Sequence, residues 1–433
     1  MHVTRFVRTD RFRRLSKEGF WVVFGQLCAM LGALVGVRFL TEFLDPSEYG
    51  QLALGMTLAM LVNQALLGPL SAGLTRFYAP AVESDDLGGY LKTAGKMLTL
   101  ATCIVICLAI FAVIGLLVTD RVEWVPIAIV VFIFSILTGY NSIFSGIQNA
   151  ARQRLVVAFH QGIEQWVRFL AAVGMMLLLG ATSTVAMVGY VLALVIVLGS
   201  QYVFFRKIAK QGLASSGHSG EWQREILKYS WPFAAWGVFT WAQLVSDRWA
   251  LSLFSTAQDV GLYAVLFQLG YYPMSIATGM AMQFLAPVFF QRAGDASDDR
   301  RNDGVDKLSW RLTGFALIAT LVVFFVAYFF HSHIFYVFAA EEYGVVSYLL
   351  PWMLLGGGVF SAGQTIALNL MSKMKTRLMM AAKITTAVLG VGLNVVGAYY
   401  GGITGVVTAS VFFSFGYFFW MVALSKKLEN QRV

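Results

Sequence analysis

Five basic side chains stand inside long apolar stretches of this sequence: Arg38, Arg76, Arg168, Arg248 and Lys383. A charge surrounded by hydrocarbon is costly, so such residues commonly mark a substrate or ion pathway. An arginine guanidinium can bind phosphate oxygens through two parallel hydrogen bonds, which a lysine cannot do. The pattern favours a cavity that takes an anion, unless nearby acids neutralise these cations.

Two of the arginines have an acid four residues away on the same stretch. Glu164 precedes Arg168, and Glu42 follows Arg38. Residues at this spacing face each other on a helix, so both pairs fit a structural ion pair. For Arg168, pairing and a place in the cavity stay open as alternatives.

Arg248 has no acid three or four residues away. Its neighbour Asp247 is expected to point about 100° away around the helix, so Arg248 is the strongest cavity candidate. Arg76 is also without an acid at helical spacing. Arg76 and Lys383 lie near enough to the ends of their stretches for their side chains to snorkel to the membrane surface.

The acids Asp247, Glu42 and Glu164 have two possible roles. A carboxylate with a raised pKa inside a membrane can couple transport to protons or sodium, whereas a structural ion pair is the simpler and preferred interpretation. Four polar side chains lie at mid-helix positions, where they either bond across helices or line a cavity. They are Asn63, Gln64, Gln243 and Gln268.

The composition shows what kind of element must carry these residues. Of 433 residues, 58% are hydrophobic and only 13% are charged, about half the share in a soluble protein. Spanning a bilayer takes about 20 apolar residues per helix. The chain is therefore predicted to be an all-α polytopic membrane protein, which excludes a soluble enzyme.

The apolar runs predict twelve membrane-spanning helices. The first six lie near 20–44, 51–78, 96–118, 125–147, 156–179 and 182–205. The other six lie near 229–254, 260–290, 310–332, 349–371, 378–400 and 403–424. Cys28, Cys103 and Cys107 fall inside these runs, and we interpret them as small buried side chains.

The net charge is +9, and its placement predicts the orientation of the chain. Basic residues gather in the segments before the first helix and after every second one, as expected of cytoplasmic loops. The opposite loops are acidic or neutral, and only Arg121 breaks the pattern. Both termini are therefore expected to be cytoplasmic.

Three short motifs recur in the two halves of the chain. Arg38 is followed by Gly50 and Arg248 by Gly261 at nearly the same spacing. Arg76–Pro80 matches Gln283–Pro287, and a Ser-Asp-Asp sequence follows each of them. A third match relates Arg154 to Arg377. We therefore predict two six-helix lobes related by a pseudo-two-fold axis along the membrane normal. The predicted division is a basic N-terminus at 1–19, lobes at 20–205 and 229–424, a cytoplasmic linker at 206–228 and a tail at 425–433.

The same motifs resemble a known family. Arg38–Gly50 is similar to the end of helix 1 in bacterial polysaccharide flippases, and Ser246–Arg248 with Val260–Tyr263 resembles their helix 7 to helix 8 junction. Glu341–Tyr343 looks like their short acidic loop before helix 10. The family is the oligosaccharide and polysaccharide (Wzx-like) branch of the MOP exporters, related to MATE drug exporters and peptidoglycan lipid flippases.

The resemblance covers nearly the whole chain and implies a two-lobed transporter with a cationic central cavity. Such proteins move undecaprenyl-diphosphate-linked oligosaccharide, for O-antigen, capsule or exopolysaccharide, from the cytoplasmic to the periplasmic leaflet of the bacterial inner membrane. We expect Arg248, Arg38, Arg168 and Arg76 to bind the diphosphate or line the cavity that takes it. One departure is the start of helix 1 at Gly19, where Ser or Thr is more usual.

Two other functions are alternatives to this one. A MATE-type multidrug exporter is the first alternative, and a membrane glycan polymerase or ligase is the second. A near match to a phosphate-binding loop at Gly89–Lys96 has Met97 where Ser or Thr should bind magnesium. We therefore expect no enzyme activity, cofactor or metal and no nucleic acid partner. A monomeric transporter is expected, with the polymerase and glycosyltransferases of the pathway as possible partners.

Overall fold

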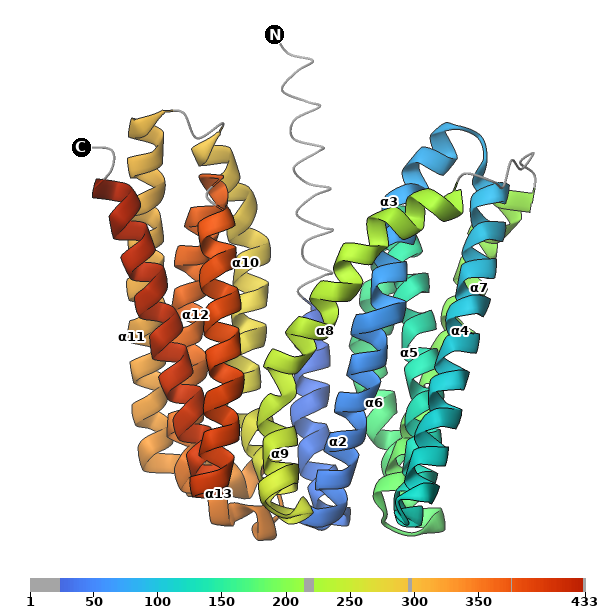
Figure 1. Ribbon diagram of the computed structural model, residues 1–433, viewed down its shortest axis with the longest axis horizontal. Coiled ribbons are helices and arrows are strands. Elements are labelled where there is room, and N and C mark those ends of the chain that lie inside the picture. Colours follow the sequence, from blue (N-terminus) through green and yellow to red (C-terminus); the bar gives the residue numbers. More distant parts are fainter. Residues whose placement is uncertain (1–23, 214–221, 295–297, 375, 431–433) are drawn as a thin grey trace. The chain divides into compact units, whose positions relative to one another are not determined.

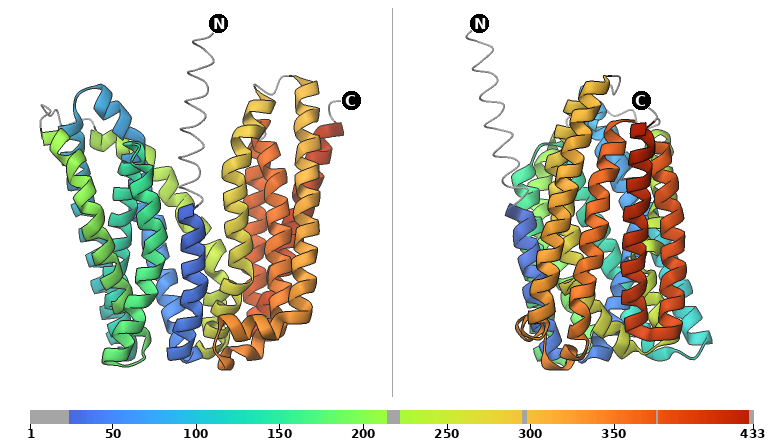
Figure 2. Two further views of the ribbon diagram at one scale, coloured as in Figure 1. Left: turned by 180° about the vertical axis from the view of Figure 1, so that it is seen from behind. Right: turned by 90° about the vertical axis from the view of Figure 1, so that its left-hand side faces the viewer.

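The computed structural model describes residues 24–213, 222–294, 298–374 and 376–430. Every regular element in the described residues is a helix (Figure 1). The basic N-terminus predicted at 1–19 lies outside the described residues. Where they are described, the long helices of each unit run side by side as a bundle (Figure 2).

The helices of the first half begin with Phe24–Phe43. They continue as α2 (Pro46–Val62), the π-helix η1 (Asn63–Leu67), α3 (Gly68–Glu83), α4 (Leu87–Val118), the short η2 (Val122–Trp124), α5 (Val125–Ala150), α6 (Arg154–Leu179) and α7 (Ser183–Leu213). The second half contains α8 (Trp222–Phe254), α9 (Ala257–Leu269), α10 (Tyr271–Ala293), α11 (Asp299–Phe338), η3 (Glu341–Leu349), α12 (Leu350–Ser372) and α13 (Thr376–Asn430).

Ten spans in the described residues are long and apolar enough to cross a membrane, compared with the twelve that the sequence predicts. One of them contains two helices, because α13 is interrupted by non-helical backbone at Gly402. The 33-residue α8 is the remaining helix of sufficient length, although it is less apolar than the ten. The predicted all-α polytopic fold is confirmed.

Two helices begin well before the predicted positions 96 and 310. Helix α4 begins at Leu87 because the Asp86 carboxylate accepts a hydrogen bond from the Gly89 amide, 3.2 Å away. Helix α11 begins at Asp299, where Asp298 accepts from two backbone amides of the first turn. Both aspartates come from the repeated Ser-Asp-Asp motif. N-caps extend a helix into polar sequence that an apolar run does not reveal.

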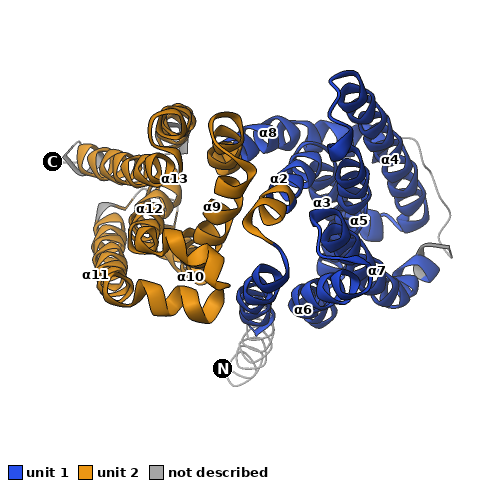
Figure 3. Cartoon of the chain, turned by 90° about the horizontal axis from the view of Figure 1, so that it is seen from below, with its two compact units in different colours: residues 1–44, 52–242 blue, residues 45–51, 243–433 orange. Residues whose placement is uncertain are grey.

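The chain forms two compact units (Figure 3). Unit 1 comprises the residues up to Leu44 together with Leu52–Ala242, and unit 2 comprises Asp45–Gln51 together with Gln243–Val433. The division therefore falls within α2 and α8, whereas the sequence places the boundary between the lobes at 206–228.

The contacts of α8 give the physical reason for this division. The Trp241 indole N–H donates to the Thr57 carbonyl, 2.7 Å away. A Cβ on Gly237 would lie 2.0 Å from the Gln64 carbonyl oxygen, so only glycine permits this approach. The first part of α8 is thus packed on α2 and η1 of unit 1.

The start of α2 belongs to unit 2 for a similar reason. A Cβ on Gly50 would lie 2.0 Å from the Ala257 carbonyl oxygen, and one on Gly261 would lie 1.8 Å from that of Pro46. These four residues form two repeat-matched pairs, so the recurring motifs contact each other directly. Each glycine of the motif allows the other copy's backbone to approach.

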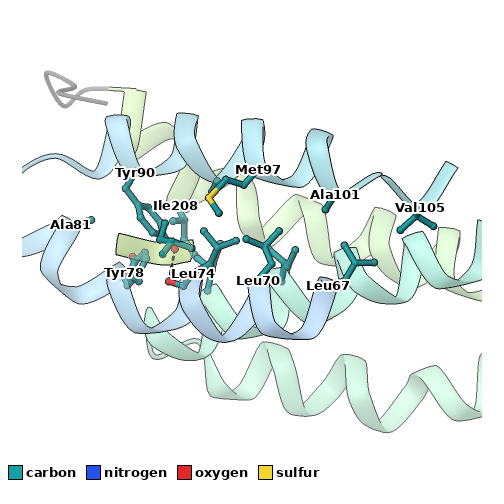
Figure 4. Packing of buried hydrophobic residues seen from close by; sticks show 14 of the residues in the cluster. Leu67, Leu70, Leu74, Tyr78, Ala81, Tyr90, Met97, Ala101, Val105 and Ile208 are labelled. Atoms are coloured by element: carbon teal, nitrogen blue, oxygen red, sulfur yellow. Dashed lines mark hydrogen bonds between the residues drawn. The ribbon is translucent and has the colours of Figure 1, made fainter. Parts of the chain in front are cut away.

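Buried side chains of unit 1 fill the space between α3 and α4 (Figure 4). The Tyr90 hydroxyl donates to the Leu74 carbonyl at 2.6 Å, which satisfies a polar group in this apolar core. The predicted burial of Cys103 and Cys107 is wrong, because both are exposed on α4. An apolar run predicts a membrane location, and within it a side chain can face lipid as well as protein.

Candidate functional site

Arg248 lies on α8 with 12% of its side chain exposed. Its guanidinium carbon lies 4.3 Å from the centre of the Phe267 ring on α9, a cation–π contact. One guanidinium nitrogen lies 3.4 Å from the Leu244 carbonyl oxygen. The arginine is thus held in a defined position in unit 2.

The prediction that Asp247 points away from Arg248 is wrong. Asp247 Oδ1 lies 3.6 Å from a guanidinium nitrogen of Arg248. The same oxygen accepts a hydrogen bond from the Arg248 backbone N–H at 2.7 Å, which folds the carboxylate back toward its neighbour. Asp247 Oδ2 accepts from the Tyr263 hydroxyl at 2.7 Å. Both oxygens of this buried carboxylate are therefore engaged, and they link α8 to α9.

Arg168 forms the predicted ion pair with Glu164 on α6. The second carboxylate oxygen of Glu164 accepts from the Asn141 amide on α5 at 2.9 Å. The guanidinium also lies 5.4 Å from the Phe134 ring and 5.5 Å from the Tyr190 ring. Arg168 therefore joins α5, α6 and α7 inside unit 1.

Arg38 and Glu42 also form the predicted ion pair, with 2.8 Å between guanidinium nitrogen and carboxylate oxygen. Their side chains are 38% and 56% exposed. Such an exposed pair contributes about 0–1 kcal/mol in water.

Arg76 and Lys383 have no acid within ion-pair distance in the described part of the chain. Arg76 is exposed on α3, which fits the predicted snorkelling. Lys383 is half-buried on α13, and its amine lies 3.3 Å from Gln364 Oε1 on α12. The contact with Gln364 places the Lys383 amine against α12 of unit 2.

The four polar candidates divide between two roles. Asn63 donates to the carbonyls of Ala59 and Ser135 at 3.1 and 3.2 Å, which links η1 to α5. Gln268 accepts from the Tyr49 hydroxyl at 2.9 Å. These two bond across helices. Gln64 and Gln243 have partly exposed side chains and remain candidates for a cavity surface.

One buried polar group was missed by the sequence analysis. The Lys373 amine pairs with Asp306, and the Asn369 amide donates to the same carboxylate oxygen at 2.7 Å. Lys373 belongs to one of the basic segments expected on the cytoplasmic side, but it is only 6% exposed. The sequence signal was the acid at 306, which falls inside α11 once the capped start of that helix is known.

The described residues contain no group of three or more His, Cys, Asp or Glu side chains that could hold a metal ion. The arrangement that they do contain is a set of guanidinium and ammonium groups braced by aromatic rings, amides and single carboxylates. Such groups can bind an anion through charge-assisted hydrogen bonds.

Comparisons with known proteins identify the family and the fold of the chain. A family described as "Polysaccharide biosynthesis protein" matches residues 7–292. No curated protein sequence gives a significant match.

The fold is similar to those of several transporters. An inward-facing multidrug resistance MATE transporter of the MOP superfamily superposes with a TM-score of 0.71 at 14% identity, over 94% of this chain and 96% of that one. The lipid II flippase MurJ, in an inward closed conformation, gives 0.70 at 12% identity over 94% and 87%. A MOP superfamily transporter from Pyrococcus furiosus gives 0.57 at 16% identity over 96% and 95%. The predicted resemblance to the MOP exporters is confirmed.

Proposed function

The chain belongs to the polysaccharide biosynthesis protein family, and we propose that it is a flippase for polyprenyl-diphosphate-linked oligosaccharide. It takes the lipid-linked repeat unit of a surface polysaccharide from the cytoplasmic leaflet of the bacterial inner membrane. It releases the unit in the outer leaflet by alternating access. Both termini lie in the cytoplasm, and the polymerase and glycosyltransferases of the pathway are its functional partners.

The balance of charge within the spans is the observation that carries this proposal. The apolar runs of the sequence contain five cations and the three acids Glu42, Glu164 and Asp247, and the buried Lys373–Asp306 pair adds one charge of each sign. Each of the three acids contacts one arginine, which leaves Arg76 and Lys383 without an acid in the described residues. An excess of fixed positive charge favours an anionic substrate, such as a diphosphate, over a cationic drug.

Arg248 is the proposed contact for the diphosphate. A guanidinium carries five N–H donors, and one hydrogen bond from this side chain to a described residue is recorded, to the Leu244 carbonyl. Phe267 and Asp247 fix its orientation without using the remaining donors. Two charge-assisted bonds to phosphate oxygens would contribute about 3 kcal/mol at the lower limit of about 1.5 kcal/mol each.

The carboxylates differ in how available they are for ion coupling. Asp247 and Glu164 are buried, and each has both oxygens engaged by neighbouring groups. Glu42 has a 56% exposed side chain, and within the described residues its ion pair is with Arg38. If an ion gradient drives the transport, Glu42 is the carboxylate that we expect to exchange ions most readily.

Transport in proteoliposomes tests the function. The purified chain should move a polyprenyl-diphosphate oligosaccharide between leaflets, whereas empty liposomes should not. The same polyprenyl carrier without the diphosphate should be a poor substrate, because the fixed cations have nothing to bind. The proposal fails if the lipid-linked glycan is not moved.

Multidrug export is the second candidate, supported by the fold similarity to a MATE transporter. A cationic dye in the same proteoliposomes distinguishes the two functions. Accumulation of the dye without movement of the lipid-linked glycan would replace the flippase with a drug exporter. A glycan polymerase or ligase would instead lengthen the glycan, which chromatography of the products detects.

A further inference from the structure

Lys383 is a cation that the ion pairs of unit 2 do not neutralise. Its amine has one described polar partner, the neutral side-chain oxygen of Gln364 at 3.3 Å. An ammonium carries three donors, so this contact leaves both charge and donors available. A charge within a membrane-spanning helix is costly until an anion joins it.

Gln364, the partner of Lys383, lies on the partly exposed face of α12. From Met353 to Leu370, every residue of this helix is buried except Leu355, Phe360 and Gln364. Phe360 and Gln364 are four residues apart and share one face. The Lys383 amine therefore meets α12 at the face that can be reached from outside the helix bundle.

A second polar group in the same region has no partner in the described part of the chain. Tyr417 is 1% exposed, and its hydroxyl has no hydrogen-bond partner in the described residues. Its ring lies 4.8 Å from the ring of Phe360, and it shares a buried cluster with Ala382, the residue next to Lys383. A buried hydroxyl without a partner is unfavourable, and an anion that reached it would accept its hydrogen bond.

The depth of this group matches that of a lipid headgroup. Lys383 is seven residues from Thr376 at the start of α13, which is about 10 Å along the helix. Gln364 is eight residues from Ser372 at the end of α12, or about 12 Å. Both ends belong to the predicted cytoplasmic side, and the hydrocarbon core is only about 30 Å of a bilayer about 40–45 Å thick. The amine thus lies near the boundary between headgroups and hydrocarbon.

We propose that Lys383, Gln364 and the Tyr417 hydroxyl form an inner phosphate subsite that binds the lipid-borne diphosphate on the cytoplasmic side. The proposal rests on the flippase function and adds a first contact for the substrate before Arg248. The Lys383 ammonium is a point charge on a flexible side chain, which suits the first binding of the diphosphate. The guanidinium of Arg248 is held in place and offers two parallel N–H donors.

Binding of a long-chain polyprenyl diphosphate to the purified full chain in detergent tests the subsite. We expect Lys383→Gln to raise the Kd about tenfold through loss of one charge-assisted contact, and Lys383→Arg to raise it less than about threefold. Lys427→Gln is the matched control, because it removes the same charge from an exposed position at the other end of the same element. Its Kd should equal that of the wild type.

Tyr417→Phe separates ligand binding from folding. Removing a hydroxyl that has no described partner should leave the melting temperature unchanged or raise it. The same variant should bind polyprenyl diphosphate about threefold more weakly. A lower melting temperature with unchanged Kd would show that the hydroxyl serves the fold, and would overturn its place in the subsite.

Three outcomes are distinguishable. If Lys383→Gln is folded, transports normally and keeps the wild-type Kd, the inner subsite is wrong and the flippase function stands. If the wild type binds polyprenyl diphosphate no better than the uncharged polyprenol, both proposals fail. If phosphatidylglycerol or inorganic pyrophosphate competes as well as the diphosphate lipid, the site is a general phospholipid or free-phosphate site, which also overturns the proposal.

Discussion

Arg168 in unit 1 and Arg248 in unit 2 are held in similar ways. They differ in whether the neighbouring acid leaves the guanidinium donors available to a ligand. Their side chains are 15% and 12% exposed, so burial does not distinguish them. Arg168 contacts Glu164 directly and lies beside two aromatic rings, whereas Arg248 lies 3.6 Å from Asp247 and over one ring.

The difference lies in how the acids are satisfied. Glu164 has Arg168 and Asn141 as its partners, so its charge depends on the arginine. Asp247 already accepts from Tyr263 and from a backbone amide. The ion pair of unit 1 therefore stabilises the fold, and the arginine of unit 2 is braced while keeping donors for a ligand. This contrast can be tested by separating stability from transport.

The largest loss of stability is expected from Arg168→Ala. It leaves the Glu164 carboxylate buried without its cation, and breaking a buried pair in this way costs about 3–5 kcal/mol. Thermal unfolding in detergent measures the loss. Arg38→Ala is the matched control, because Arg38 and Glu42 have the same spacing in an exposed pair, where about 0–1 kcal/mol is expected. Equal losses in the two variants would contradict the contrast.

Arg248→Ala should instead affect transport. Loss of two charge-assisted bonds to the diphosphate corresponds to about 3 kcal/mol, or roughly a hundredfold lower transport rate. Arg248→Lys should give an intermediate rate, because a lysine keeps the charge but loses the fork. Proteoliposome assays measure both rates, with thermal unfolding as the check on folding. If both variants fold and transport at the wild-type rate, Arg248 is an anchor and not a substrate contact.

Tyr263→Phe tests the brace between α8 and α9. It removes one hydrogen bond to a charged group, so we expect a loss of about 1.5 kcal/mol in stability and a severalfold lower transport rate. If Asp247 only positions Arg248, the variant should lose the same fraction of its rate with and without proton or sodium gradients. A loss confined to assays with an imposed gradient would make Asp247 a coupling residue instead.

The sequence predicted the fold more completely than the site. The all-helical membrane fold follows from the apolar runs, since hydrocarbon requires helices of a fixed length. The ion pairs of Arg38 and Arg168 follow from spacing along one helix. The approach of Asp247 to Arg248 does not, because it depends on a side chain folding back onto a backbone amide.

Contacts between helices could not be predicted from the sequence, for a related reason. The orientation of Lys383 toward Gln364 and the burial of Lys373 beside Asp306 depend on how α12 packs against α13 and α11. Periodicity within one helix does not contain that information. The match between Gly50 and Gly261 was visible in the sequence, but their direct contact required the structure.

The smallest expected effect concerns the turn that follows the fourth helix of each half. Arg152 after α5 and Met374 after α12 have φ values of 60° and 58°, the left-handed region that favours glycine. Met374→Gly should therefore stabilise the chain by about 0.5–1 kcal/mol, since strain is relieved at an exposed side chain that contributes little packing. Met374→Ala is the control and should give no gain, because alanine keeps the strain.

Arg152→Gly should give a similar gain in unit 1 if both copies of the repeat use the same turn. A gain in only one unit, measured by thermal unfolding, would show that the two repeats differ at this junction as they do around Arg168 and Arg248.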